Sequence, residues 1–140
     1  QIKVEVLNSS AESPLMLAAL KGDKDLCQRL IQKGADVNKP GWAPLHYAAT
    51  NGHLDVMNLL LDEHAYIDAA SPNNTTPLMM AAYYGTPLAV KLLLEEGADP
   101  TLRNQVNASA LDFALSADRA QSAFYVRAFI ESWEIQQGSN

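Results

Sequence analysis

The stretch of sequence that decides the fold reads Ala43-Pro44-Leu45-His46-Tyr47-Ala48-Ala49-Thr50-Asn51-Gly52-His53-Leu54-Asp55-Val56-Met57-Asn58-Leu59-Leu60-Leu61. Its proline suits the first position of a helix, where a missing N–H costs nothing. Leu45, Ala48 and Ala49 then form one narrow apolar stripe at helical spacing. Gly52 suits the left-handed residue that ends a short helix, and the leucines that follow supply the apolar stripe of a second one. The stretch therefore predicts two short helices joined by a tight turn.

The same pattern recurs along the chain in a fixed register. The position of Pro44 is occupied by Pro14, Pro77 and Ala110, at successive spacings of 30, 33 and 33 residues. Glycines that should adopt left-handed backbone follow the prolines by eight residues, at Gly22, Gly52 and Gly85. Hydroxyl side chains that can cap the first helix precede this position, at Ser13, Thr76 and Ser109. This internal repetition indicates a repeat architecture.

The second helix of each unit also has an equivalent in the others. Its apolar stripe is formed by Leu26/Cys27/Leu30/Ile31, Val56/Met57/Leu60/Leu61 and Ala89/Val90/Leu93/Leu94. Gly34 and Gly97 close this helix, and turn-forming residues follow. One helix pair of this size cannot bury its own apolar face, whereas stacked pairs can. The sequence thus predicts a linear solenoid of helix pairs with an extended concave side.

The chain resembles the ankyrin repeat family. Residues 43–61 and Gly97-Ala98-Asp99 follow the family pattern T-P-L-H-x-A-A-x-x-G-H-x-x-V-V-x-L-L-L…G-A-D. The resemblance as a whole covers residues 1–117. The resemblance implies an all-α ankyrin repeat solenoid of four helix-turn-helix repeats with short hairpin-like connecting loops. We expect the tail of a preceding, missing repeat at 1–12, repeats at 13–42, 43–75 and 76–108, a degenerate C-terminal capping repeat at 109–137, and a frayed tail at 138–140.

Several positions depart from the family pattern. The connection from Gly34 to Pro44 is three residues shorter than that from Gly97 to Ala110, which predicts a clipped turn with a blunted tip. His64 replaces a closing glycine, so we expect either a left-handed histidine or a different cap. Asp112 replaces the histidine of the pattern in the last repeat. Residues 119–133 predict one long helix that buries Ala123, Val126, Phe129, Ile130 and Trp133 and turns Gln121, Arg127, Glu131 and Glu134 outward.

The first five residues align in phase with residues 64–68, at the end of a repeat. We therefore expect that the chain is a fragment, or the ordered part, of a longer protein. A first repeat without a preceding neighbour also predicts self-association through that uncapped repeat.

Composition excludes several classes of protein. Apolar residues make up 48% and charged residues 19%, a balance typical of a globular chain. Ten basic against sixteen acidic residues give a formal charge of −6, which argues against nucleic acid as a partner. No apolar run approaches the roughly 18 residues of a membrane span. Cys27 is the single cysteine, so it cannot form an internal disulfide, and its repeat position predicts an inert, buried side chain.

Candidate catalytic and metal-binding groups find a simpler explanation in the repeats. His46, His53 and His64 have no third ligand recurring at metal spacing. In the family, the histidine at the position of His46 hydrogen-bonds its own turn. The carboxylates Asp62-Glu63 and Glu95-Glu96 fall at equivalent second-helix ends, as solvated surface does. Glycine-rich phosphate loops are absent from the sequence. We therefore expect no enzyme, no metal and no cofactor.

The resemblance implies three sets of partner-binding positions. They are the residue before the Thr-Pro pair, the two residues after Ala-Ala, and the turn tips. Carried onto this chain, they give Glu12, Trp42, Thr75 and Ala108; Leu20/Lys21, Thr50/Asn51, Tyr83/Tyr84 and Ser116/Ala117; and Lys39, Ser71, Asn73, Arg103 and Gln105. From these positions, the predicted binding set is Lys39, Trp42, Thr50, Asn51, Ser71, Asn73, Thr75, Tyr83, Tyr84, Arg103 and Gln105.

The aromatic members of this set stand out. Tyr83 and Tyr84 favour a contact role, because aromatic side chains anchor interfaces. For Trp42 two interpretations stay open, an anchor for a partner or a filler of the shortened turn. Methionines adapt to varied partners. Met80, however, shares the position of Leu17, Tyr47 and Phe113, which predicts burial.

The sequence thus predicts a non-enzymatic scaffold that binds a protein through its concave face and turn tips. The alternative is a regulatory or positioning segment of a larger protein whose other domain carries the activity. A small-molecule hydrolase would need a pocket with convergent titratable groups, which this composition does not indicate. Residues 38–50 also resemble small exported bacterial ankyrin repeat proteins, which predicts the bacterial periplasm as the location, with the cytoplasm as the alternative.

Overall fold

The computed structural model describes residues 13–138. Within that range the chain forms α-helices and no strand, and a single isolated antiparallel bridge joins Arg103 to Ser109. The helices are α1 (Pro14–Lys21), α2 (Lys24–Gln32), α3 (Pro44–Thr50), α4 (Leu54–Asp62), α5 (Pro77–Tyr84), α6 (Pro87–Glu95), α7 (Ala110–Ser116) and α8 (Ala120–Gly138). The predicted all-α class and the helix-turn-helix repeats are confirmed.

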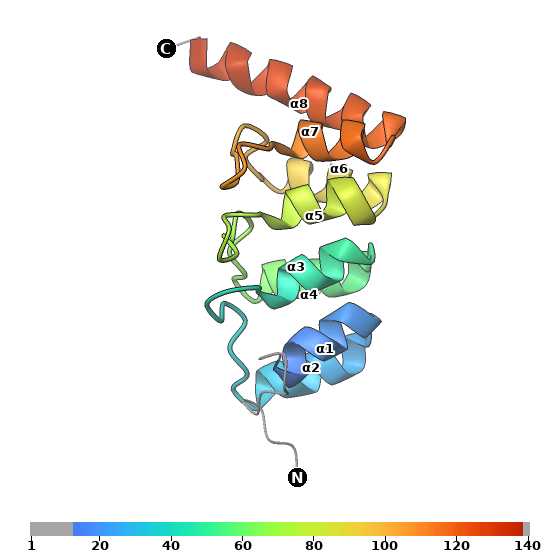
Figure 1. Cartoon of the computed structure of the whole chain (residues 1–140). Helices are drawn as coiled ribbons and strands as arrows, with labels where there is room; N and C mark the ends of the chain where they lie inside the picture. The colour runs from blue at the N-terminus through green and yellow to red at the C-terminus, as the bar shows by residue number, and fades with distance from the viewer. Residues whose placement is uncertain (1–12, 139–140) are drawn as a thin grey trace.

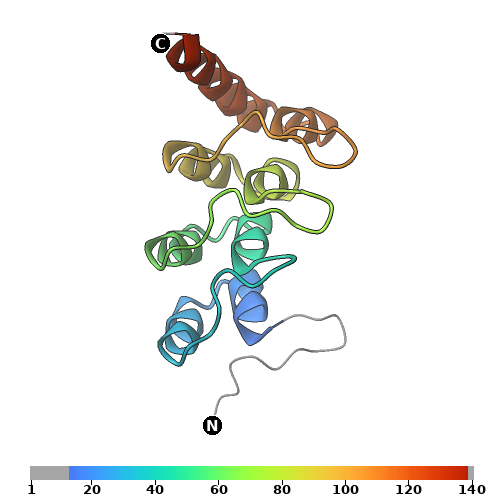
Figure 2. The same ribbon diagram turned by 90° about the vertical axis from the view of Figure 1, so that its left-hand side faces the viewer.

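The helix pairs stack side by side in chain order (Figure 1). Seen along the helices, α1, α3, α5 and α7 form one row and α2, α4 and α6 a second, with the turns projecting beyond the first row (Figure 2). Ala19, Ala49 and Ala82 have no exposed surface, and their small side chains let the first helices pack closely. The second helices lie further apart, so the face formed by the first helices and the turns is the concave one.

Three of the four first helices begin with the cap that the sequence predicts. The hydroxyls of Ser13, Thr76 and Ser109 accept a hydrogen bond from the backbone N–H three residues later. The side chain of that later residue accepts the backbone N–H of the cap residue in return. In α3, where the cap residue Ala43 has no polar side chain, the imidazole of His46 still supplies the second half of this pair.

The turns between paired helices confirm two of three glycine predictions. Gly22 and Gly52 are left-handed, with φ of 77° and 67°. The prediction for Gly85 is wrong, because its φ is −87° and its ψ is −149°. Pro87 restricts the preceding Thr86 to extended backbone, with ψ of 158°, whereas Asp23 and His53 at the same position have ψ of 86° and 87°, so the chain takes a different path through this turn. Glycine is needed there for another reason, since an added Cβ would overlap the carbonyl oxygen of Ala49.

The second helices end as predicted. Gly34 and Gly97 are left-handed, with φ of 97° and 103°. His64 is also left-handed, with φ of 71°, which resolves the alternative left by the sequence. A histidine tolerates this region better than a β-branched residue does.

The core runs through the whole stack. Cys27, Met57 and Val90 occupy equivalent positions and have no exposed surface. Burial raises the pKa of the Cys27 thiol to about 11, consistent with the predicted inert side chain. The prediction that Met80 is buried is wrong, because it is half-buried and faces the concave side.

The last helix is longer than the sequence pattern predicts. α8 has 19 residues, against nine in each of α2, α4 and α6. Ala123 and Val126 are buried, and Phe129, Ile130 and Trp133 are half-buried. Gly138 still belongs to the helix, while 139–140 and the predicted tail of a preceding repeat at 1–12 lie outside the described residues.

Candidate functional site

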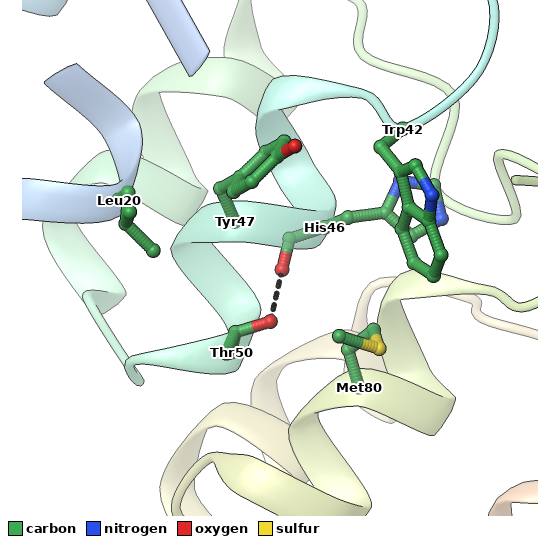
Figure 3. A pocket seen from close by; sticks show the side chains of 6 residues that line it. All are labelled: Leu20, Trp42, His46, Tyr47, Thr50 and Met80. Atoms are coloured by element: carbon green, nitrogen blue, oxygen red, sulfur yellow. Dashed lines mark hydrogen bonds between the residues drawn. The ribbon is translucent and has the colours of Figure 1, made fainter. Parts of the chain in front are cut away.

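A hollow opens on the concave side where three first helices meet. It has a volume of about 270 Å³ and is lined by Leu20 from α1, Trp42 from the first turn, His46, Tyr47 and Thr50 from α3, and Met80 from α5 (Figure 3). Most of this lining is carbon. Small-molecule sites usually enclose about 300–1,000 Å³. The hollow lies just below this range and has room for one large side chain.

The wall of the hollow is fixed by His46. Its Nδ1 accepts the backbone N–H of Ala43 at 3.0 Å, and its Nε2 lies 2.8 Å from the carbonyl oxygen of Thr75, to which it donates. These two partners assign the neutral imidazole with its proton on Nε2. Burial lowers the pKa of His46, which favours the same neutral form. As the family resemblance implies, the side chain bonds its own turn.

Trp42 stands at the edge of the same hollow. Its ring meets the His46 ring edge-on, with centroids 5.1 Å apart and planes at 75°. The side chain is half-buried, so it packs on His46 and also presents surface to the hollow. Thr50 lies on the next turn of α3 and donates its hydroxyl proton to the carbonyl oxygen of His46 at 2.8 Å (Figure 3).

The predicted tyrosine pair lies further along the concave face. Tyr83 occupies the repeat position of Leu20 and Thr50. Its ring packs edge-on against Tyr84 with centroids 4.6 Å apart, and against Phe113 with centroids 5.9 Å apart. Tyr83 is half-buried, whereas Tyr84 is 56% exposed. Tyr84 therefore offers the larger surface to solvent.

Two of the predicted binding residues lie inside a turn instead. Ser71 and Thr75 are each only 3% exposed. The hydroxyl of Ser71 accepts the backbone N–H of Thr75 and donates to the side-chain oxygen of Asn73. The hydroxyl of Thr75 accepts a hydrogen bond from the side-chain amide of Asn104 at 3.2 Å, so both buried hydroxyls have partners within the protein. Their predicted role as contact surface is not supported.

The remaining predicted tip residues are at the surface. Asn73 and Gln105 join two turns, since the backbone N–H of Gln105 donates to the Asn73 carbonyl at 3.0 Å and its side chain to that of Pro72 at 3.1 Å. Arg103 forms an exposed ion pair with Asp112 at 3.3 Å. Lys39, by contrast, borders a second hollow of about 200 Å³ beside Tyr66, Ala69 and Ala70. Asn51 is exposed and donates to the Leu20 carbonyl at 2.7 Å.

The first turn differs from the other two, as its length predicts. Backbone bonds from Ser71 to Thr75 and from Asn104 to Ala108 close the second and third turns. Among the residues that the structure describes, 36–42 form no equivalent backbone pair. The clipped turn therefore leaves the hollow beside Lys39 at the place where a neighbouring tip would lie.

The other positions that the family pattern implies are also partly exposed and partly half-buried. Lys21 and Ser116 are exposed, Leu20, Ala108 and Ala117 are half-buried, and Glu12 lies outside the described residues.

Sequence reasoning missed a set of polar side chains that join successive turns. Asn38 donates to the His64 carbonyl at 2.9 Å and accepts the N–H of Tyr66 at 2.8 Å. Asp68, 30 residues later, accepts the N–H of Asp99 at 3.1 Å. Burial raises the pKa of Asp68, and the nearby Asp99 carboxylate acts in the same direction. Asn38 and Asp68 are 30 residues apart, which is the spacing of the first two repeats, and this spacing could have revealed that they share a role.

Within residues 13–138 no group of three or more His, Cys, Asp or Glu is placed to hold a metal ion. Nε2 of His53 lies 2.9 Å from the Leu20 carbonyl, and His64 is exposed at a helix end. In the same part of the chain, no helix combines the length and apolar character that crossing a bilayer requires.

A stack of helix pairs with an apolar hollow on its concave side defines a binding module of the repeat class. The family model described as "Ankyrin repeats (3 copies)" matches residues 2–71, and the model of a single ankyrin repeat matches residues 73–105. The chain therefore belongs to the ankyrin repeat family, whose members generally bind proteins and generally have no enzymatic activity.

Curated relatives contain this kind of segment within much longer chains. Ankyrin repeat and SAM domain-containing protein 6 of Mus musculus is 41% identical over 56% of this chain and 9% of its own length. BCL-6 corepressor-like protein 1 of Homo sapiens is 34% identical over 79% of this chain and 6% of its own. Palmitoyltransferase ZDHHC13 of Homo sapiens is 32% identical over 78% of this chain. The chain spans less than a fifth of the length of each of them.

Proposed function

We propose that this chain binds a partner protein through its concave face, and that the hollow beside Trp42 takes one large apolar side chain from an extended segment of that partner. The hollow carries the proposal, because it combines an apolar wall, room for about one side chain and a position that spans three repeats. Burial of an apolar anchor in such a pocket is a common source of binding energy in protein interfaces.

Exposed polar side chains support an extended segment as the ligand. Asn51, Asn73 and Gln105 are exposed, and side-chain amides can bond a peptide backbone. Tyr84 adds a second aromatic surface further along the face. The formal charge of −6 favours partners with basic residues beside the anchor, because opposite charges speed association.

The first test is selection of peptides from a displayed library on the immobilised protein. We expect selected peptides to share one large apolar residue and to lose binding to Met80→Lys, which places a charge in the hollow. Leu88→Lys introduces the same charge at a side chain that is 58% exposed on α6, outside this hollow, and is the matched control. Equal binding by Met80→Lys and the wild type would refute the hollow as the anchor site.

The second test uses the fluorescence of Trp42 as a reporter. Trp133→Phe removes the other tryptophan, so that the remaining emission comes from Trp42. Binding in the hollow should shift this emission to shorter wavelength, because the ligand displaces water from the ring. Tyr83→Ala combined with Tyr84→Ala should weaken binding without abolishing that shift. An unchanged spectrum with bound peptide would place the contact elsewhere.

A second candidate function is that of a regulatory or positioning segment in a larger protein. The observation that favours it is the small share of the relatives' length that this chain spans, in proteins that include a palmitoyltransferase and a 2-5A-dependent ribonuclease. The gene sequence on either side of this chain distinguishes the two: an adjoining catalytic domain favours positioning, and further repeats favour a binding scaffold.

The bacterial periplasm remains our proposed location, with the cytoplasm as the alternative, on the resemblance of residues 38–50 alone. Fractionation of cells that express the full gene product tests it. Recovery in the cytoplasmic fraction would contradict the periplasmic location. Self-association through the first repeat likewise remains a prediction.

A further inference from the structure

The outer side of α8 carries an apolar stripe. The helix lies across the end of the stack (Figure 1), with Ala123 and Val126 buried against the preceding helices. On the opposite side of the helix, Ala120, Phe124, Ala128 and Ile135 fall on one line at helical spacing. Phe124 is 66% and Ile135 63% exposed. We call these four residues the α8 stripe.

This stripe departs from the pattern of the other second helices. The position of Phe124 is occupied in the earlier repeats by Gln28, Asn58 and Lys91. The position of Ala128 is occupied there by Gln32, Asp62 and Glu95. Polar residues suit these positions because they face solvent on the convex side, and a capping helix usually keeps a polar outer face. The exchange to apolar residues is therefore specific to α8 and is not needed by the stack itself.

A further ankyrin repeat in the same register fits poorly against this end. Leu115 stands where Ala19, Ala49 and Ala82 allow neighbouring first helices to approach closely, and it is 49% exposed. A leucine in that place would hold a following first helix away. The end of the stack is thus shaped for a different neighbour.

We propose that the α8 stripe is the contact surface for a second copy of this chain, with the two α8 helices antiparallel. A two-fold axis between positions 129 and 130 places Phe124 of one copy opposite Ile135 of the other. Each copy then supplies the same surface, as two-fold symmetry requires. The small Ala128 side chains lie near the axis and allow the helices to approach closely.

Charge favours the antiparallel direction. Arg127, Glu131 and Glu134 lie along one flank of the stripe. In the part of the chain that the structure describes, the only ion pair is Arg103–Asp112, so these three side chains are not paired within one copy. Antiparallel helices bring the same flanks together, and the register above sets Arg127 of each copy beside the two glutamates of the other. Parallel helices would bring this flank against the uncharged Gln121 and Ser132 instead.

The contact is smaller than a standard interface, which buries about 800 Å² on each partner. A single pair of 19-residue helices supplies less than that, so we expect a weak dimer with a dissociation constant on the order of 10 μM. Sedimentation velocity over a protein concentration series from about 1 to about 200 μM covers this range. The wild type should move from monomer to dimer within it.

The decisive comparison is between variants that leave the fold unchanged, as checked by circular dichroism. Phe124→Gln should weaken dimerisation at least tenfold, whereas Leu88→Gln, which alters a side chain 58% exposed on α6, should leave it unchanged. Arg127→Glu should also weaken it, and the double exchange Arg127→Glu with Glu131→Arg should restore it, because the opposite charges meet again across the axis.

Three outcomes overturn the proposal. A wild-type chain that stays monomeric over the whole range shows that no second copy binds. A dimer that survives Phe124→Gln lies elsewhere, for instance at the first repeat. If the double charge exchange dimerises no better than Arg127→Glu alone, the antiparallel register is wrong. Peptide binding to the Trp42 hollow is measured separately, so failure here does not affect the proposed function.

Discussion

Replacing His46 by methionine should lower the stability of the protein near neutral pH and remove part of its sensitivity to acid. Met16 and Met79 occupy the same position in other repeats and accept the N–H of the cap residue through sulfur, so His46→Met preserves the local cap. The variant loses the bond from Nε2 to the Thr75 carbonyl. That carbonyl still accepts the N–H of Ser71 at 3.0 Å, so no buried group is left without a partner.

The size of the effect follows from one hydrogen bond and one proton. A neutral hydrogen bond contributes about 1 kcal/mol to the free energy of unfolding, so the variant should be less stable by about that amount near pH 7.5. Burial lowers the pKa of His46 in the folded state, while the unfolded chain binds its proton near the ordinary value of about 6.5. The unfolded state therefore gains protons first as pH falls. Wild-type stability is fully present above about pH 6.5 and declines below it, by up to about 1.4 kcal/mol at pH 5.5.

The assay is urea unfolding of both proteins by circular dichroism at about pH 7.5, 6.5 and 5.5. All other titrating groups are shared, so the difference in free energy between the two proteins isolates His46. We expect a difference of about 1 kcal/mol at pH 7.5 that falls to about zero at pH 5.5. A difference that stays constant with pH, or that grows in acid, would refute the assignment of a neutral, buried His46.

Three further perturbations follow from the packing. The buried Cys27 thiol, with its pKa raised to about 11, should resist a thiol reagent in the native protein and react once urea unfolds it, and rapid native labelling measured by absorbance would contradict this. Gly85→Ala should lower stability by about 1–3 kcal/mol because the new methyl group meets the Ala49 carbonyl, and an unchanged urea midpoint would show that the backbone gives way. Asp68→Asn should raise stability at pH 7 by less than about 1 kcal/mol, because the raised pKa of Asp68 means that its charged form is disfavoured in the folded state. This gain should shrink as the pH approaches 4, where the carboxyl group takes up a proton. A loss of stability in urea unfolding at pH 7 would count against this reasoning.

Most of the fold could be predicted because the same signals for helix starts, helix ends and apolar faces recur in each repeat. The positions of Pro14, Pro44 and Pro77 at helix starts follow from the missing N–H of proline alone. Gly85 shows the limit of that reasoning. A glycine in a repeated position suggests a repeated φ, yet Gly85 differs from its equivalents because Pro87 restricts the preceding Thr86 to extended backbone. The glycine is needed instead by the neighbouring helix, which the local sequence does not contain.

The candidate site was less predictable, for the same reason. Trp42 could be found as a conspicuous aromatic residue, but only the packing shows that Met80 and Leu20 come from two other repeats to complete the hollow. The family pattern predicts contact roles for Ser71 as a turn tip and for Thr75 as the residue before the Thr-Pro pair. In the structure the Ser71 hydroxyl bonds within its own turn, and the Thr75 hydroxyl accepts from Asn104 of the next turn. Family position thus predicts which face a residue is near, and hydrogen bonding decides whether its side chain is available.

In each first helix, the side chain of the third residue accepts a hydrogen bond from the backbone N–H of the cap residue. Three kinds of acceptor do this in the four repeats: a methionine sulfur in two of them, an imidazole nitrogen and a carboxylate oxygen. Locally these atoms are interchangeable. Among these four side chains, the imidazole of His46 is the one that bonds the next repeat, through its second ring nitrogen. Local unfolding at the start of α3 therefore also breaks the bond to the Thr75 carbonyl in the following turn. These two repeats should unfold together at this contact, whereas the repeats of a simple solenoid can unfold one after another.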